Sequence, residues 1–272
     1  MNVSLKTAVI TGSSRGLGRA IAVKLAQEGV KKIAVHYCTR RDEAEKTASQ
    51  VRSAGAEAVL VQGDTSDAKR AEELIPEAAD QIGGCDIFVQ SVIPTLDKIY
   101  EHKLAPEVPL AKWQMAFDTQ ARAFFLGASA AAKYMRHGGR IIALSYTPGG
   151  VTGGWQPWVG MGSAKAAVES MCKYFAVALG RHGATVNAVS PGVSDESTLV
   201  GQFPKEAQDA VQAWIDAGWT PMRRRVTPGD IANVCALLCS DEASFVTGQT
   251  IVVDGGSSLM NPDFPLALQV PE

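Results

Sequence analysis

The stretch Thr11-Gly12-Ser13-Ser14-Arg15-Gly16-Leu17-Gly18 decides the fold of this 272-residue chain. It follows a short apolar run, Thr7–Ile10, that is typical of a buried strand, and it precedes a helix-length segment. Glycines at this spacing permit a tight turn and let the backbone approach a pyrophosphate closely, while free N–H groups at the helix start bind the anion. The stretch therefore predicts a strand–turn–helix unit that binds a dinucleotide.

Strand-type and helix-type segments alternate along the whole chain. The expected strands are Thr7–Thr11, Lys32–Tyr37, Ala58–Gln62, Ile87–Gln90, Arg140–Ser145, Thr185–Ser190 and Thr250–Val253. The expected helices are Gly18–Gly29, Asp42–Ala54, Ala68–Ile82, Lys112–Arg136, Ser163–His182 and Pro228–Leu238. This alternation predicts an α/β fold, a Rossmann-type doubly wound parallel sheet in a single domain.

Two long connections interrupt the pattern, Pro94–Leu110 and Pro191–Met222. Connections of this length in a compact domain are usually functional. We expect one domain over residues 1–260, with a substrate lid over about 193–222 and a C-terminal tail over 261–272.

Composition excludes several classes of protein. The net charge of −2 and the pI near 6.1 argue against a general nucleic-acid binder, and no apolar stretch approaches the ~20 residues that a membrane span needs. The chain enters its first strand almost at once, so no signal peptide is expected. Cys235 and Cys239 are spaced as half of a metal site, but no Cys/His pair completes it. We expect buried thiols, no metal and a reducing cytoplasm.

The turn and the ends of the next two strands supply the predicted dinucleotide site. Its residues are Gly12, Ser14, Arg15, Gly16, Leu17, Gly18, Arg40, Arg41, Asp64 and Thr65. An acidic residue at the end of the second strand would hold the ribose hydroxyls of NAD, but none occurs before Asp42.

Arg40 and Arg41, with Arg15, instead offer guanidinium groups to a 2′-phosphate, which predicts NADPH as the cofactor. The alternative is that one or both arginines are solvated residues at a helix start. Asp64 either reaches the adenine or N-caps the next turn.

With these features, Ser145, Lys165, Asn187–Gly192 and Gly248–Gly256 make the chain resemble the short-chain dehydrogenase/reductase family over essentially its whole length. The resemblance implies a nicotinamide cofactor, further cofactor contacts from Lys165, Pro191, Gly192 and Val193, and a homotetramer.

Several positions depart from the family pattern. Where the family has Tyr-x-x-x-Lys, this chain reads Met161-Gly162-Ser163-Ala164-Lys165, so the lysine is present and the tyrosine is not. Gln90 begins the segment that is usually Asn-Asn-Ala-Gly, Gln120 stands at the usual catalytic Asn, and Glu196 stands at the usual Thr. No Ser/His/Asp triad is readable, because His36, His102, His137 and His182 lie outside the motif segments.

With these departures the chain resembles the enoyl-acyl-carrier-protein reductases of the superfamily. In those enzymes six residues separate the tyrosine from the lysine. The segment Leu144–Tyr146, followed by Val159–Lys165, resembles the corresponding segments of those enzymes. Trp158, however, stands at the position of their tyrosine. A narrower resemblance is to 1-cyclohexenylcarbonyl-CoA reductases, which also lack the usual tyrosine.

Four residues are expected to carry the chemistry. Lys165 binds the nicotinamide ribose and supplies positive potential. Tyr146 is the remaining oxyanion donor or proton source, and Ser145 is a second hydroxyl donor. Trp158 has only an N–H to donate, so it either stabilises an oxyanion or is a wall residue.

The substrate pocket is expected from Gly149–Trp158, Pro94–Leu110 and Val193–Met222. The last segment contains Phe203, Trp214 and Trp219. The two tryptophans either pack in the core or contact the substrate. The basic run Arg223-Arg224-Arg225 faces either an acidic group of the substrate carrier or solvent.

The leading hypothesis is an NADPH-dependent reductase of the C=C bond of a 2-enoyl thioester, carried on CoA or on an acyl carrier protein. Reduction of a ketone requires an acid that protonates the substrate oxygen. In reduction of an enoyl thioester, hydride adds at Cβ, a donor stabilises the enolate oxygen, and Cα is protonated afterwards. The alternatives are a 3-oxoacyl thioester ketoreductase that uses Tyr146 as its acid, and a non-catalytic nucleotide-binding protein.

Overall fold

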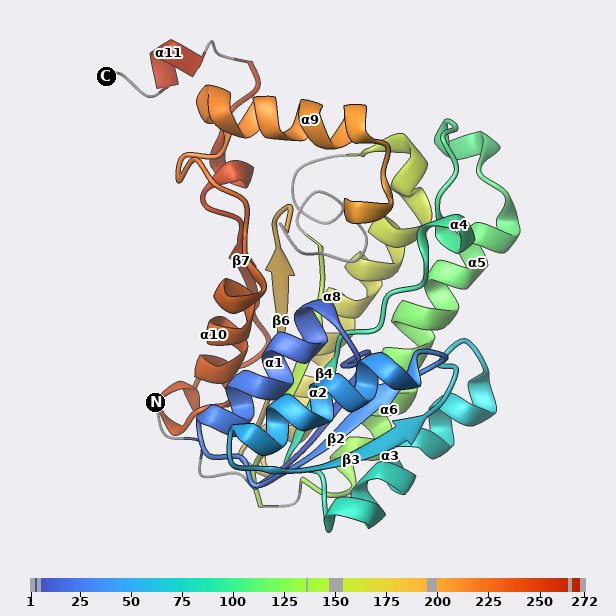
Figure 1. Cartoon of the computed structure of the whole chain (residues 1–272), viewed down its shortest axis with the longest axis vertical. Helices are drawn as coiled ribbons and strands as arrows, with labels where there is room; N and C mark the ends of the chain where they lie inside the picture. Colours follow the sequence, from blue (N-terminus) through green and yellow to red (C-terminus); the bar gives the residue numbers. More distant parts are fainter. Residues whose placement is uncertain are drawn as a thin grey trace.

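Seven parallel strands form one sheet in the order β3-β2-β1-β4-β5-β6-β7 (Figure 1). The structure is a computed structural model that describes residues 3, 6–135, 137–146, 154–194, 200–263 and 266–269. The strands are β1 (Thr7–Thr11), β2 (Lys32–Tyr37), β3 (Glu57–Gln62), β4 (Ile87–Gln90), β5 (Gly139–Leu144), β6 (Ala184–Pro191) and β7 (Thr250–Val253). The predicted fold class and all seven predicted strands are confirmed, with bounds that differ by at most one residue.

Helices cover both faces of the sheet. They are α1 (Gly16–Gln27), α2 (Arg41–Ser53), α3 (Ala68–Ile82), α4 (Leu96–Ile99), α5 (Leu110–Phe117), α6 (Ala123–Ala132), α8 (Val159–Gly180), α9 (Lys205–Trp214), α10 (Pro228–Cys239) and α11 (Leu266–Gln269). Alternation along β1 explains the two layers, because Ala8 and Ile10 pack with α1 and α10 while Val9 packs with α3 and α6. All three side chains are fully buried, as in a sheet covered on both sides.

The strand order places the ligand cleft. β1 pairs with β2 on one side and with β4 on the other, so the chain changes direction across the sheet between β1 and β4. Ligands of such sheets bind at this switch point, outside the carboxyl ends of the strands. In Figure 1 the helix α9, which belongs to the segment expected as a lid, lies beyond the carboxyl end of β6.

The predicted single helix over 112–136 is wrong in one respect. A π-helical segment, Asp118–Arg122, separates α5 from α6. Its cause is a side chain from the sheet, because the Gln90 amide donates to the carbonyl oxygens of Thr119 (3.2 Å) and Gln120 (3.0 Å) and so inserts into the helical hydrogen-bond ladder. Such segments occur often at functional sites.

The two long connections carry short helices of their own. Pro94–Leu110 contains α4 and a 3₁₀ turn over Ala105–Glu107, and the expected lid contains α9 followed by a π-helical turn over Ile215–Trp219. The lid residues 195–199 lie outside the described part of the chain.

Packing of α6 against β4 yields a stability prediction. A Cβ on Gly127 would lie 2.6 Å from Cζ of Phe88, a ring that is 1% exposed, whereas a Cβ on Gly180 at the end of α8 would meet nothing within 4 Å. Alanine is worth up to about 1 kcal/mol over glycine in a helix, but overpacking costs about 1–3 kcal/mol. We expect Gly127→Ala to lower the free energy of unfolding in urea by about 1 kcal/mol.

The matched control is Gly180→Ala, which we expect to leave stability unchanged or raise it by about 0.5 kcal/mol. Equal stabilisation by both substitutions would contradict the packing of Gly127 against Phe88.

Candidate active site

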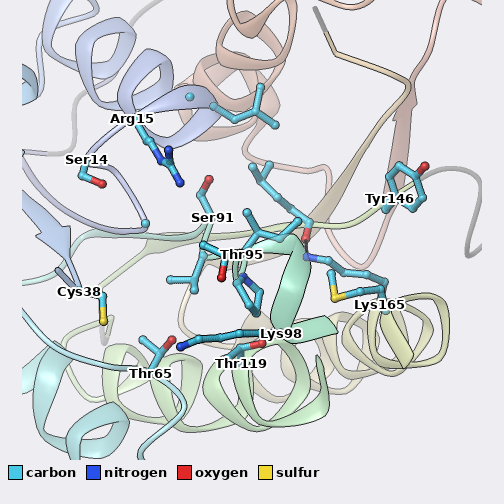
Figure 2. Close-up of a pocket in the computed structure, with 18 of the residues that line it drawn as sticks. Ser14, Arg15, Cys38, Thr65, Ser91, Thr95, Lys98, Thr119, Tyr146 and Lys165 are labelled. Atoms are coloured by element: carbon cyan, nitrogen blue, oxygen red, sulfur yellow. Dashed lines mark hydrogen bonds between the residues drawn. The ribbon is translucent and has the colours of Figure 1, made fainter. Parts of the chain in front are cut away.

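A cleft of about 320 Å³ lies at the carboxyl ends of the strands. Most of the predicted site residues line it: Gly12, Ser14, Arg15, Gly16, Leu17, Arg40, Asp64, Thr65, Ser145, Tyr146, Trp158, Lys165, Pro191, Gly192 and Val193. Gly18 and Arg41 do not. Figure 2 shows that one end of the cleft carries Ser14, Arg15 and Thr65 and the other carries Tyr146 and Lys165.

The glycine turn brings three segments into close contact. Gly12 has φ +69°, and a Cβ there would lie 2.7 Å from the Ser91 oxygen and from the Val92 nitrogen. A Cβ on Gly18 would lie 2.5 Å from the Gly12 oxygen, so Gly18 permits α1 to pack on the turn rather than facing a ligand. The first turn of α1 has no side-chain cap and no acidic residue. Its backbone N–H groups and positive dipole end therefore fit a pyrophosphate.

His36 is a cleft residue that the sequence motifs did not reveal. Its Nδ1 accepts a hydrogen bond from the Gly12 N–H (2.9 Å), so the neutral ring carries its hydrogen on Nε2 and donates to the Gly63 oxygen (3.0 Å). Burial lowers the pKa of His36 to about 4. The uncharged ring thus joins the glycine turn to the end of β3, and its position at the end of β2 was the available signal.

Arg15 and Arg40 form the basic end of the cleft. Burial, and then the nearby Arg40 charge, lower the pKa of the Arg15 guanidinium. Two mutually repelling guanidinium groups fit an anionic ligand that would neutralise both. Arg41 instead begins α2 and lies 3.7 Å from the Glu45 carboxylate with most of its side chain exposed.

Asp64 caps the turn after β3, which was the alternative to contacting the adenine, and it also lines the cleft. Its Oδ1 accepts hydrogen bonds from the backbone N–H of Ser66 (2.9 Å) and from the Ser66 hydroxyl (2.7 Å). The carboxylate therefore caps the turn that follows β3.

Lys165 is buried on α8, with 6% of its surface exposed. Its amine donates to the Leu144 oxygen at the end of β5. Burial lowers the pKa of Lys165 to about 7, and the Glu169 carboxylate partly opposes that shift. Met161, one turn earlier, lines the cleft where the family tyrosine would stand.

Ser145 and Tyr146 are adjacent but have different environments. The Ser145 hydroxyl donates to the Glu169 carboxylate, so its proton is not directed to a substrate. Burial raises the pKa of Tyr146 to about 12, which keeps the phenol protonated near neutral pH. Figure 2 shows the Tyr146 hydroxyl pointing away from the Lys165 amine, so Lys165 does not activate Tyr146 as an acid in this arrangement.

Trp158 is 3% exposed, and its indole N–H has no hydrogen-bond partner among the residues that the structure describes. Unsatisfied buried donors are uncommon and call for an explanation such as a ligand. The ring stacks on Trp155 with centroids 5.2 Å apart and lies 5.9 Å from the Tyr146 ring. Tyr100 contacts Trp155, Trp158 and Phe203 at 5.4–6.2 Å. These aromatic residues give this end of the cleft an apolar wall suited to an acyl group.

Gln90 and Gln120 stand where the family has asparagines, and each side chain hydrogen-bonds to the backbone of the other's segment. While Gln90 donates to the π-helical carbonyls, Gln120 Nε2 donates to the Val92 oxygen at 3.1 Å. Both side chains are at least 96% buried. These hydrogen bonds hold Thr119 and Val92, which line the cleft.

Other expected site residues lie elsewhere. Trp214 stacks on Trp219 at 4.8 Å and is half exposed, so these tryptophans lie apart from the cleft. Arg224 forms an ion pair with Asp230 (2.6 Å). Glu196 and residues 149–153 of the expected segment Gly149–Trp158 lie outside the described residues.

Cys235 and Cys239 are buried thiols on α10, as expected. Across the described ranges, no group of three or more metal-ligating side chains is present. None of the helices described there is both long and apolar enough to cross a membrane.

A dinucleotide cleft at the switch point, with a buried lysine at its reactive end, defines an oxidoreductase of the nicotinamide-dependent type. The sequence model of the family described as Enoyl-(Acyl carrier protein) reductase matches residues 12–258. The chain belongs to this family of short-chain dehydrogenases/reductases.

Two curated relatives share about a third of their residues with this chain. The 1-cyclohexenylcarbonyl-CoA reductase of Streptomyces collinus is 35% identical over 95% of this chain and 89% of its own. The 3-oxoacyl-(acyl-carrier-protein) reductase of Staphylococcus aureus strain Mu50 is 34% identical over 92% and 97%. Among solved structures, a putative short-chain alcohol dehydrogenase of Sinorhizobium meliloti 1021 superposes with a TM-score of 0.84 at 28% identity, over 94% of this chain and 97% of its own.

The burial of Lys165 yields a pH-dependent stability prediction. Its folded pKa of about 7 lies below the ~10.4 of an unfolded lysine. Below pH 7 both states are protonated and the folded state bears the full cost of the buried charge. Between pH 7 and 10 only the unfolded chain keeps the proton, so this group's contribution to stability rises with pH. We expect Lys165→Met to raise the free energy of unfolding by about 2–4 kcal/mol at pH 6, with a smaller gain at pH 9.

Urea denaturation at both pH values measures this difference. Lys173→Met, at an exposed position of the same helix, is the control and is expected to show no such pH dependence. A gain for Lys165→Met that is the same at pH 6 and pH 9 would show that Lys165 titrates outside this window.

Proposed function

We propose that this protein catalyses the NADPH-dependent reduction of the C=C bond of a 2-enoyl thioester carried on CoA or on an acyl carrier protein. The observation that carries the proposal is the buried N–H of Trp158, which has no partner among the described residues and belongs to a ring that lines the cleft beside Met161, the residue at the position of the family tyrosine. The reactive end thus offers hydrogen-bond donors but lacks an acid activated by the lysine.

The two candidate reactions differ in where the proton goes. When bound, NADPH supplies a hydride, which would add to Cβ of an enoyl thioester or to the carbonyl carbon of a 3-oxoacyl thioester. In the first case negative charge collects on the thioester oxygen, and a proton from the medium then adds to Cα. In the second case the substrate oxygen itself must receive a proton. Donation from Trp158 and from Tyr146 stabilises the enolate oxygen, and neither donor must lose its proton.

The choice of cofactor rests on the basic end of the cleft. Arg15 and Arg40 line it, and no acidic residue follows β2 before Asp42. An acid there would bind the 2′-hydroxyl of NADH and repel a 2′-phosphate. The arginines therefore favour NADPH.

The thioester assignment draws on the relatives. The Streptomyces collinus relative is named for reduction of a cyclohexenylcarbonyl-CoA, and the matching family is named for enoyl groups on a carrier protein. The aromatic wall formed by Trp155, Trp158 and Phe203 suits a planar conjugated acyl group.

A 3-oxoacyl ketoreductase is the second candidate, because the Staphylococcus aureus relative is named for that reaction. Tyr146 would then be the acid. Its pKa of about 12 and its separation from Lys165 make it a poor acid, since an effective one has a pKa near the working pH.

Matched substrates test the proposal directly. Oxidation of NADPH is followed at 340 nm with enoyl and 3-oxoacyl thioesters of the same chain length, including crotonyl-CoA and cyclohexenylcarbonyl-CoA. We expect turnover with the enoyl set, slower turnover with NADH, and none with the 3-oxo set. Turnover of the 3-oxo set alone would make the protein a ketoreductase. Binding of NADPH without any turnover would favour a non-catalytic role.

The role of Trp158 is tested by Trp158→Phe, which keeps an aromatic ring and removes the N–H. Loss of one preorganised donor to an oxyanion typically costs 10²–10³ in kcat. We expect kcat for the enoyl substrate to fall about 100-fold while the Kd of NADPH stays unchanged. Trp155→Phe, in the adjacent stacked ring, is the control, with an expected change below about threefold. Equal losses in the two variants would reduce Trp158 to a packing residue.

A further inference from the structure

Lys98 lies on α4, in the segment that follows β4, and lines the same cleft as the glycine turn. Figure 2 shows its side chain extending across the cleft so that the amine lies beside Thr65, while Arg15 lies on the opposite side. Electrostatic effects agree with this position. Burial opposes ionisation of Asp64, but hydrogen bonds from Ser66 and the charge of Lys98 together lower the pKa of Asp64.

The charge of Lys98 is not neutralised by a close partner. None of the ion pairs or side-chain hydrogen bonds within the described ranges includes its amine. The described lining of the cleft holds four cationic side chains, those of Arg15, Arg40, Lys98 and Lys165, against the single carboxylate of Asp64. In a chain of net charge −2, this local excess of positive charge fits a ligand with several phosphate charges.

The same short helix forms part of the aromatic pocket. Leu96 and Ile99 of α4 are buried in a cluster with Trp158 and Met161. Tyr100 directly follows the helix, and its ring contacts Trp158. Lys98 and Tyr100 are thus two residues apart. Lys98 lines the nucleotide end of the cleft, and Tyr100 packs on the aromatic side chains that line the acyl end.

Hydrogen bonds hold α4 as a unit between these two ends. The Lys112 amine donates to the backbone oxygens of Asp97 (2.9 Å) and Tyr100 (2.7 Å). The Leu96 N–H donates to Oε1 of Gln202 in the lid (2.9 Å). Because these hydrogen bonds hold α4 in place, a shift of Lys98 is coupled to the positions of Tyr100 and of the lid.

We propose that Lys98 binds a pyrophosphate oxygen of the dinucleotide from the side opposite Arg15, and that this contact couples cofactor binding to the acyl pocket through α4. The proposal rests on the dinucleotide site of the proposed function but not on which bond is reduced. With the amine engaged, α4 holds Tyr100 against Trp158, so the acyl thioester binds more tightly to the cofactor complex than to the free protein. By linkage, the acyl thioester tightens cofactor binding by the same factor.

Cofactor affinity tests the contact. The Kd values of NADPH and NADH are measured by titration calorimetry for the full chain and for Lys98→Met, Lys98→Arg, Arg40→Ala and Lys103→Met. A charged hydrogen bond supports an effect of about 10-fold or more. We expect Lys98→Met to weaken both nucleotides about 10-fold and Lys98→Arg to restore most of the affinity. Arg40→Ala should weaken NADPH alone, because only NADPH has the 2′-phosphate.

Lys103→Met is the matched control, because Lys103 lies in the same segment but pairs with Glu101 at 2.8 Å and does not line the cleft. Equal weakening by Lys98→Met and Lys103→Met would overturn the proposal, since it would indicate a general charge effect. Unchanged nucleotide affinity in Lys98→Met would also overturn it.

Coupling is tested by the Kd of butyryl-CoA, a saturated thioester, with and without saturating NADP⁺. We expect NADP⁺ to tighten butyryl-CoA binding about fivefold or more in the native chain and not in Lys98→Met. The same titration with the N-acetylcysteamine thioester, which lacks phosphates, distinguishes the sources of the anion. A Lys98→Met effect seen only with the CoA thioester would assign Lys98 to a CoA phosphate and overturn the proposal.

The binding measurements on Lys98 do not depend on which bond the enzyme reduces. If the protein reduces 3-oxoacyl rather than enoyl thioesters, the nucleotide Kd values and the coupling factor still test Lys98. If NADPH and NADH both fail to bind the native chain, the dinucleotide site itself is refuted.

Discussion

The close approach of the Gly12 backbone to the end of β4 is the contact on which the rest of the cleft depends. A Cβ at this position would lie 2.7 Å from the Ser91 oxygen, so only glycine fits, and the Gly12 N–H donates to Nδ1 of His36. His36 in turn donates to the end of β3, so three strand ends are held together at one point. Because the ring is buried and neutral, this junction adds no charge of its own. The positive charge of the site comes from side chains that a phosphate can reach.

Much of this arrangement was predictable from the sequence because it depends on local patterns. The strands follow from short apolar runs, and the glycine turn follows from the spacing of Gly12, Gly16 and Gly18. In both cases the relevant information lies within a few residues of chain. The expected positions of Lys165 and Trp158 came instead from the resemblance of their segment to the family pattern.

The remainder could not be read from the sequence because it depends on contacts between distant segments. The π-helical turn exists because the Gln90 amide reaches a helix about 30 residues later in the chain, and no helix propensity signals that. The Ser145 hydroxyl looked available until the fold placed Glu169 beside it. Lys98 belongs to a segment with no nucleotide-binding motif, and its place in the cleft results from the path of the chain after β4.

The replacement of the family tyrosine by Met161 changes what Lys165 can do. A lysine beside a phenol lowers the pKa of that phenol and shares its proton. Here the Lys165 amine donates to the Leu144 oxygen, and burial lowers its pKa while the Glu169 carboxylate partly opposes that shift. In the proposed function the lysine would hydrogen-bond to a bound ribose, while proton donation has no activated phenol to perform it. This absence of an activated phenol is the reason why the proposed function is a reaction in which charge is stabilised on oxygen, rather than one in which oxygen is protonated.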